Sequence, residues 1–201
     1  MSGFEELIGS TDAEFNEVLL SIPTNRIESW KYVPTRILSR TSWSPAEVRQ
    51  SSNFALSGGE FLNIPENLDS LPNFTKDETT RMEEFRTAHG FNGIHHALQK
   101  KTCVLTCRSS SETYLELHRL ANQAKSAGFA SLLLRIQANA QLTLVERFER
   151  KVIEAQNLDS FAIFLTVEPD AHVTHIRFQQ SNDQAYQFTS LDVRLSKNSS
   201  Y

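Results

Sequence analysis

Residues 131–140 have the sequence SLLLRIQANA, and two later stretches repeat its pattern: AIFLTVEPDA at residues 162–171 and SLDVRLSKNS at residues 190–199. Side chains of a β-strand alternate between its two faces, so the copies are compared at every second position. One face is aliphatic in all three copies: Leu132, Leu134, Ile136; Ile163, Leu165, Val167; Leu191, Val193, Leu195. The other face, which we expect to be largely solvated, carries Arg135, Gln137, Thr166, Glu168, Asp192, Arg194 and Ser196. Each copy is therefore predicted to be a strand with one face in a core.

Each copy ends in a residue suited to a tight corner: Asn139, Asp170 or Asn198. Asn and Asp tolerate left-handed backbone and cap their own turns. Strands and corners that recur together at periods of roughly 20 to 50 residues, with no helix between them, are typical of a parallel β-solenoid. The alignment continues past the corner, where it pairs Leu142 with Val173, Thr143 with Thr174, Val145 with Ile176 and Glu146 with Arg177.

The next member of this alignment is Tyr201, the last residue of the chain. The sequence thus stops on the first residue of the strand that is expected to follow, which leaves the last strands of the solenoid with an open edge. We therefore expect an incomplete solenoid, truncated at its C-terminus, that is poorly soluble or self-associates through this edge.

Composition and charge exclude several classes of protein. The chain has 201 residues, of which 39% are hydrophobic, enough for a core of ordinary size. Its net charge is −4 with scattered Lys and Arg, which argues against a nucleic-acid platform or a patch for anionic membranes. No apolar run approaches the length of a transmembrane helix, and the acidic N-terminus is unlike a signal peptide. We expect a cytoplasmic protein.

The first hundred residues are organised differently from the rest. A capping box at residues 11–14 begins a helix that ends before Pro23, residues 2–8 form a weaker helix, and another begins at Thr75. Residues 53–62 are predicted to form a hairpin around a glycine turn. A boundary near Lys100 then separates a small α+β region, residues 1–100, from the first rungs of the solenoid, residues 101–201. Strands are predicted at 103–107 and 114–120, although Tyr114, Leu117 and Leu120 also have the spacing of a helix.

Cysteines and histidines are the candidate metal ligands. Cys103 and Cys107 are roughly 13 Å apart if their segment is a strand, too far for a disulfide or shared chelation, whereas a helix would bring them one turn apart. We favour two buried, inert thiols. His95 and His96 are zinc or iron-sulfur ligands in one interpretation, but we favour a short helix over residues 94–100 whose apolar side is Ile94 and Leu98. His172 and His175, the latter aligned with Leu144, are predicted to be buried or half-buried neutral histidines rather than ligands. No catalytic, metal-binding or cofactor-binding residue is assigned.

The most specific local string is PTNRIESWKYVP at residues 23–34. It holds a buriable Trp30 and Tyr32 and an acid–base pair, Glu28 and Lys31, which suits an extended segment that fastens onto a neighbouring surface. These four residues are predicted to be a packing anchor or a docking motif.

This string resembles the P-T-x-x-x-E-x-W-K-Y-T-P signature of the SufB/SufD family, scaffold components of the SUF iron-sulfur cluster assembly system, with Val33 in place of Thr. The predicted hairpin, the helical segment 91–98 and the A-x-L-T-L-V-E run at residues 140–146 are similar to the family in the same order. Because the chain lacks a long cysteine-bearing N-terminal extension, it is more similar to SufD than to SufB.

The resemblance implies an N-terminal helical region, a right-handed parallel β-helix, and a C-terminal helical domain, absent here, that docks the SufC ATPase. It implies a non-catalytic scaffold subunit that acts with SufB-like and SufC-like proteins in a bacterial cytosol or a plastid. The cluster would be handled by the full complex, with none bound by this chain alone. Two alternatives stay open: a β-solenoid carbohydrate-active enzyme, although the stacked solvent positions offer no acidic pair, and a plain interaction module.

Overall fold

The computed structural model describes residues 23–24, 26–33, 35–45, 55–57, 90–99, 101–108, 112–121, 124–150, 156–180 and 184–201. The helices predicted at 2–8, at 11–22 and from Thr75 lie outside these residues, as does most of the hairpin predicted at 53–62. From that hairpin one strand is described, β2 (Ala55–Ser57). The other N-terminal elements are the 3-10 helix η1 (Glu28–Trp30), the helix α3 (Thr35–Arg40), the short strand β1 (Ser44–Pro45) and the helix α5 (Gly90–Leu98).

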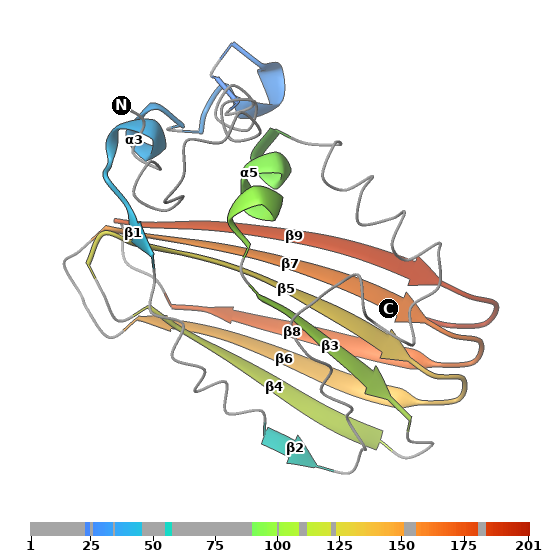
Figure 1. Ribbon diagram of the computed structural model, residues 1–201. Coiled ribbons are helices and arrows are strands. Elements are labelled where there is room, and N and C mark those ends of the chain that lie inside the picture. Colours follow the sequence, from blue (N-terminus) through green and yellow to red (C-terminus); the bar gives the residue numbers. More distant parts are fainter. Residues whose placement is uncertain are drawn as a thin grey trace.

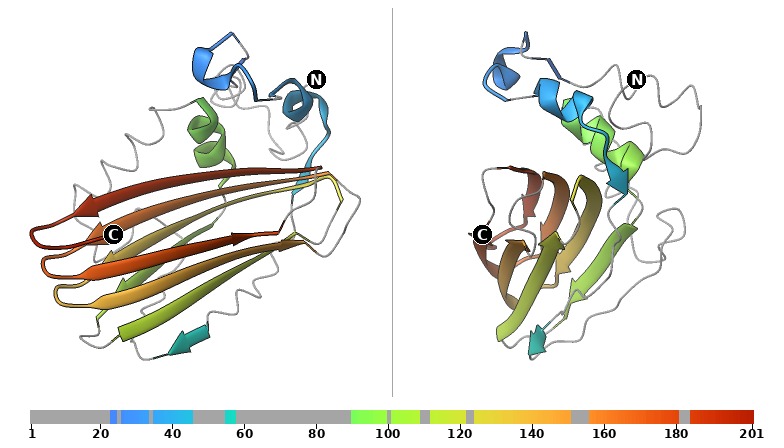
Figure 2. Two further views of the ribbon diagram at one scale, coloured as in Figure 1. Left: turned by 180° about the vertical axis from the view of Figure 1, so that it is seen from behind. Right: turned by 90° about the vertical axis from the view of Figure 1, so that its left-hand side faces the viewer.

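Seven strands follow, and they form two facing sheets (Figure 1). The first sheet contains β5 (Ser126–Ile136), β7 (Asn157–Val167) and β9 (Ala185–Leu195), with β1 and β3 (Lys101–Cys107) also paired to β5. The second contains β4 (Glu112–Ala121), β6 (Gln141–Arg150) and β8 (His172–Gln179), with β2 at its edge. From β4 to β9 the chain alternates between the two sheets, so each pass adds one strand to each (Figure 2).

The predicted register of the repeat is confirmed. β5, β7 and β9 are adjacent parallel strands in which Ser131 pairs with Ala162 and Ala162 with Ser190. In the second sheet Leu142 pairs with Val173 and Glu146 with Arg177, also as the alignment predicts. Every ladder is parallel except that of β2 with β4. The chain is therefore mainly β with parallel sheets and few helices.

The corners between the sheets also form as predicted. Asn139, Asp170 and Asn198 have φ angles of 64°, 60° and 58°, the left-handed region that Asn and Asp tolerate best. The corners stack directly, because the Asn139 N–H donates to the Pro169 carbonyl at 3.1 Å and the Asp170 N–H to the Lys197 carbonyl at 3.1 Å. The Asn198 side chain also donates to Asp170 Oδ1 at 3.0 Å.

The main core lies between the sheets and holds the aliphatic face of the repeat. Leu165 and Val167 in β7 are fully buried. The third copy departs from the prediction, because Leu191 and Leu195 in β9 are 40% and 52% exposed. Their exposure has a simple cause: among the described residues β9 pairs only with β7, and no other described strand covers its second edge.

The outer face of the first sheet is less solvated than the sequence predicted. Near the starts of its strands, residues on this face join a second core with α3, α5 and the residue before β1: Leu38, Trp43, Phe91, Ile94, Ala127, Phe129 and Leu158. Figure 1 shows α3 and α5 lying over this sheet. Only the later part of the face is open to solvent, where Arg135 and Thr166 are half-buried and Arg194 is exposed. Alternation within a strand cannot reveal that a distant helix covers one end of it.

Two further boundaries correct or confirm predictions. Helix α5 begins at Gly90, four residues before the predicted start at residue 94. The predicted strands at 103–107 and 114–120 are confirmed as parts of β3 and β4. In the described parts of the chain no helix combines the length and hydropathy needed to cross a membrane.

Candidate functional site

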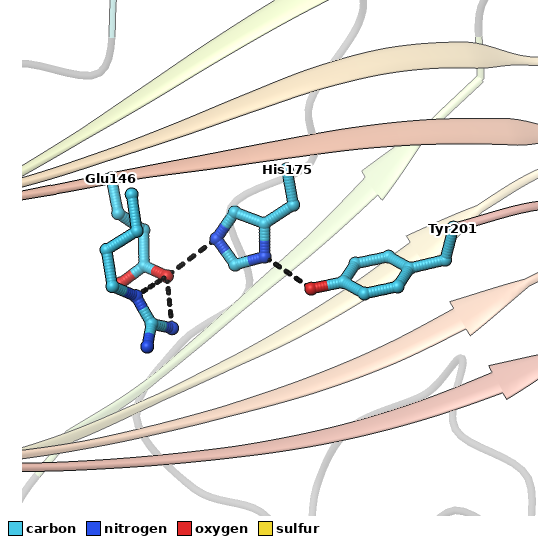
Figure 3. A network of polar contacts seen from close by, with 4 residues as sticks. Glu146, His175 and Tyr201 are labelled. Carbon is cyan, nitrogen blue, oxygen red and sulfur yellow. Dashed lines mark hydrogen bonds and ion pairs between the residues drawn. The ribbon is translucent and has the colours of Figure 1, made fainter.

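A cluster of polar side chains within the described part of the molecule joins Glu146 of β6, His175 and Arg177 of β8, and Tyr201 (Figure 3). It lies on the inward side of the second sheet, because Leu142 and Leu144 occupy the same face of β6, four and two positions before Glu146, and belong to the main core. The Glu146 side chain is completely buried, and those of His175 and Arg177 are 6% and 32% exposed.

Three donors converge on one oxygen of the buried carboxylate. Glu146 Oε1 accepts hydrogen bonds from His175 Nε2 at 2.7 Å, from Arg177 Nη2 at 2.8 Å and from Arg177 Nε at 3.1 Å. A carboxylate removed from water is tolerated only when it is paired and hydrogen-bonded in this way. The ion pair thus joins two residues that lie opposite each other and holds β6 and β8 in register.

The carboxylate also fixes the tautomer of His175. Because the Glu146 carboxylate accepts at Nε2, it selects the tautomer whose proton lies on that nitrogen, and in this tautomer Nδ1 accepts from the Tyr201 hydroxyl at 2.7 Å. Burial raises the pKa of the Tyr201 phenol, which stays protonated and able to donate at neutral pH. The arrangement is a directed chain of hydrogen bonds from Tyr201 through His175 to Glu146. It can hold a proton and order the end of the second sheet.

A second polar cluster fastens helix α5 to the first sheet. His95 is 3% exposed, its Nδ1 lies 2.7 Å from Ser160 Oγ of β7, and its Nε2 lies 2.9 Å from Ser131 Oγ of β5. The Gln99 carbonyl oxygen, 3.1 Å from Nε2, can only accept, so Nε2 donates and Nδ1 accepts from Ser160. Burial lowers the pKa of His95 from 6.5 to about 4, with a smaller contribution from the nearby His96. The imidazole is therefore neutral at physiological pH and acts as a clamp.

The residues predicted as a docking or packing motif are close together but differ in environment. Trp30 is half-buried, and its ring centroid lies 6.2 Å from that of Phe91 and 6.1 Å from that of Phe188. Lys31 Nζ lies 3.8 Å from Glu28 Oε1, with both side chains largely in solvent. Tyr32, which the sequence analysis described as buriable, is 88% exposed. The segment is also not extended, because residues 28–30 form η1.

The other candidate ligands are dispersed. Cys107 is a buried free thiol at the end of β3, and the side chain of Cys103 is not among those described. His172, predicted to be at least half-buried, is exposed and bonds Ser200 Oγ at 2.7 Å. It is exposed because it begins β8 and points to the side opposite Val173. Among the described residues no group of three or more His, Cys, Asp or Glu side chains is placed to hold a metal ion.

Sequence reasoning placed Glu146 opposite Arg177 but did not recognise the pair as buried. The sequence did hold a signal of this burial. Both residues lie at every second position from core residues of their own strands, so their side chains point to the same inward face. The clamp of His95 on Ser131 and Ser160 was also missed, because it joins a helix to two strands far apart in the sequence.

Comparison with known protein families gives one match. Residues 118–201, from β4 to the end of the chain, match the family model described as SUF system FeS cluster assembly, SufBD core domain. The match spans the stacked strands β5 to β9, although it covers less than half of the chain. The match supports a relation between this chain and the SufB/SufD family, and it indicates involvement in iron-sulfur cluster assembly. Comparison with curated proteins and with solved structures gave no significant match.

Proposed function

We propose that this chain is a SufD-like scaffold subunit that works with a SufB-like subunit and a SufC-like ATPase in iron-sulfur cluster assembly. The observation that carries the proposal is the SufBD core match, because it falls on the part of the chain whose repeat and register the sequence also singles out. The signature-like string at residues 23–34 adds independent support from the other half of the chain.

In this proposal the stacked strands are the start of a right-handed parallel β-helix. Support comes from the alternation of β4 to β9 between two sheets and from the stacked left-handed corners. Such a stack is rigid, because each strand is hydrogen-bonded along its length and its inner side chains interlock with those of its neighbours. Rigidity suits a subunit whose role is to hold partner surfaces at a fixed separation.

The chain then acts by position rather than by catalysis. Iron and sulfide are the cargo of the assembled complex, and we assign no ligand for them in this chain. Glu146 is engaged by Arg177 and His175 inside the stack, and Glu168 lies 4.0 Å from Arg135 on the outer face. These two carboxylates form ion pairs on different faces of the stack. A carbohydrate-active enzyme needs two carboxylates on either side of one glycosidic bond, so this arrangement does not favour that alternative.

Co-purification tests the proposal. The tagged chain is co-expressed with the SufB-like and SufC-like proteins of the same genome and recovered under anaerobic conditions. The proposal predicts that the SufB-like protein is retained at a fixed stoichiometry. A folded chain that retains neither partner contradicts it.

Two substitutions in the N-terminal motif separate docking from packing. Tyr32→Ala removes a side chain that is 88% exposed, so it leaves stability unchanged and weakens retention only if the motif docks a partner. Trp30→Ala removes a ring stacked near Phe91 and Phe188, so it lowers stability in either case. Loss of partner retention in Tyr32→Ala with an unchanged melting temperature identifies a docking motif.

A further inference from the structure

The segment from η1 to α3 is fixed to the first sheet by its buried side chains. The Trp30 ring lies 6.2 Å from that of Phe91 and 6.1 Å from that of Phe188, measured between ring centroids. Leu38 and Trp43 are fully buried, and the Trp43 indole N–H donates to the Leu38 carbonyl at 2.8 Å. Side chains that this segment directs into solvent are therefore held on a fixed support, which lowers the entropic cost of binding a partner.

Three large apolar side chains of this segment are exposed. Ile27, Tyr32 and Ile37 are 49%, 88% and 43% exposed, and they fall within eleven consecutive residues. A single exposed apolar side chain is common on protein surfaces, whereas a group of them marks an interaction site. Tyrosine in particular is enriched among the residues that contribute most to the binding energy of protein interfaces.

Helix α3 presents a mixed basic and apolar side to solvent. Arg36, Ile37 and Arg40 are exposed, whereas Thr35 and Leu38 are buried. At about 100° per residue, the three exposed positions span one arc of about 100° and the two buried ones lie on the opposite side. Both η1 and α3 lie on the side of the first sheet that faces away from the second sheet (Figure 2).

The same segment is basic although the chain as a whole is acidic. Between residues 23 and 45 four basic residues and one acidic residue give a net charge of +3, in a chain of net charge −4: Arg26, Lys31, Arg36, Arg40 and Glu28. All four basic residues are exposed. Lys31 Nζ lies 5.6 Å from the centroid of the Tyr32 ring, so a partner group that reaches this ring also meets a cation.

We propose that this N-terminal basic surface, made of the four basic residues with Ile27, Tyr32 and Ile37, binds an acidic amphipathic segment of another protein. Carboxylates of the partner pair with the basic side chains, and its apolar side chains cover the three exposed ones. Glu28 lies among the basic residues, 3.8 Å from Lys31 Nζ, and it repels a continuous row of phosphates such as that of a nucleic acid or a membrane. A protein segment can place a neutral side chain at that point.

This inference does not depend on the proposed scaffold role, because it uses only the exposed side chains and charges of one segment. Three short helical peptides serve as probes of the full chain, and their binding is measured by fluorescence anisotropy. The first carries Glu along one side and Leu along the other, the second keeps the Glu residues but has Gln in place of Leu, and the third has Lys in place of Glu. The Glu/Leu peptide is expected to bind, the Glu/Gln peptide to bind at least about tenfold more weakly, and the Lys/Leu peptide not to bind.

Charge reversal locates the binding surface on the chain. The double variant Arg26→Glu with Lys31→Glu is expected to weaken binding of the Glu/Leu peptide by about tenfold, because two attractions become repulsions. Arg194→Glu with Lys197→Glu is the matched control, since it changes the net charge equally at the other end of β9 and is expected to leave binding unchanged. All four residues are exposed, so both double variants keep the melting temperature of the wild-type chain.

Several results overturn the proposal. The first is a Glu/Leu peptide that does not bind, or that binds no better than the Glu/Gln peptide. Equal weakening by the two double variants shows that only net charge matters. Tighter binding to a single-stranded oligonucleotide or to vesicles of anionic lipid assigns the surface to phosphates instead. Self-association of the wild-type chain that Arg26→Glu with Lys31→Glu abolishes assigns it to a second copy of this chain.

Discussion

Replacing Arg177 with Met removes two of the three hydrogen bonds described for the buried carboxylate of Glu146. Glu146 is fully buried, and Arg177 supplies two of its hydrogen bonds, at 2.8 and 3.1 Å. Breaking a buried ion pair costs about 3 to 5 kcal/mol, because the remaining charge is left without compensation. Arg177 is 32% exposed and His175 keeps its own bond to Glu146, so the expected cost falls below that range, at about 2 kcal/mol.

Urea or thermal unfolding measures this cost. For a chain of this size, a loss of about 2 kcal/mol lowers the melting temperature by about 6 °C. Arg135→Met is the matched control in the neighbouring sheet, where the Arg135 Nε lies 4.0 Å from Glu168 Oε1 at the solvent-facing end. Loss of this partly solvated pair is expected to cost about 0.5 kcal/mol.

The double variant Glu146→Leu with Arg177→Met separates a buried charge from simple loss of packing. Removing the carboxylate along with its partner removes the uncompensated charge, so the double variant is expected to be more stable than Arg177→Met. His175 loses its acceptor in the double variant, which offsets about 1 kcal/mol of that gain. The reasoning is refuted if the double variant is less stable than Arg177→Met, or if Arg177→Met costs no more than the Arg135→Met control.

Three further predictions test other parts of the fold. His95 has a pKa of about 4 in the folded chain and 6.5 when unfolded, so the unfolded state binds the proton more readily and stability falls as the pH drops from 6.5 to 4. Between pH 7 and 5, protonation of His95 lowers the free energy of unfolding of the wild-type chain by about 2 kcal/mol. If His95→Gln shows the same pH dependence as the wild-type chain, another group is responsible. Leu165→Ala is expected to cost about 3 kcal/mol and Leu195→Ala less than about 1 kcal/mol, because the first side chain is fully buried and the second is 52% exposed; equal costs in denaturant unfolding contradict the assigned layers. Asn139→Ala is expected to cost about 1 kcal/mol because of its φ of 64°, whereas Asn139→Gly is close to neutral; the reverse order in melting temperature argues against the left-handed corner.

The arrangement of the stacked strands could be predicted from the sequence because one periodicity determines it. Once Leu132, Ile163 and Leu191 are aligned, the alignment determines which residues of each strand point inward, where each corner lies and how the strands of the second sheet pair. The observed ladders agree with this alignment. The corner residues gave an independent check, since only a few side chains tolerate a positive φ.

Features that depend on contacts between distant segments could not be predicted in this way. The burial of Phe129 and Leu158 on the outer face depends on α3 and α5, which lie far from them in the sequence. The exposure of Leu195 depends on which strands neighbour β9, and that information is not contained in the pattern of β9 itself.

The candidate site shows the same division between local and distant information. The alignment gave the pairing of Glu146 with Arg177, but the inward orientation of both side chains was not predicted, although both occupy positions that continue the aliphatic series. It could not show that His175 and Tyr201 extend the pair into a hydrogen-bonded chain, because that depends on side-chain conformations at the end of the stack. The exposed position of Tyr32 is likewise set by the local turn after η1 rather than by its residue type.

Iron and sulfide retained after anaerobic reconstitution test the proposed role most directly. The SufB-like and SufC-like proteins are supplied with iron, a sulfur source and ATP, with and without this chain, and the protein-bound iron and acid-labile sulfide are then measured. If the chain is a scaffold subunit, bound iron and acid-labile sulfide rise together when the chain is present. Both return to background when the chain is replaced by the Leu165→Ala variant under conditions in which that variant is unfolded. Equal iron and sulfide with and without the folded chain contradict a role in building the cluster.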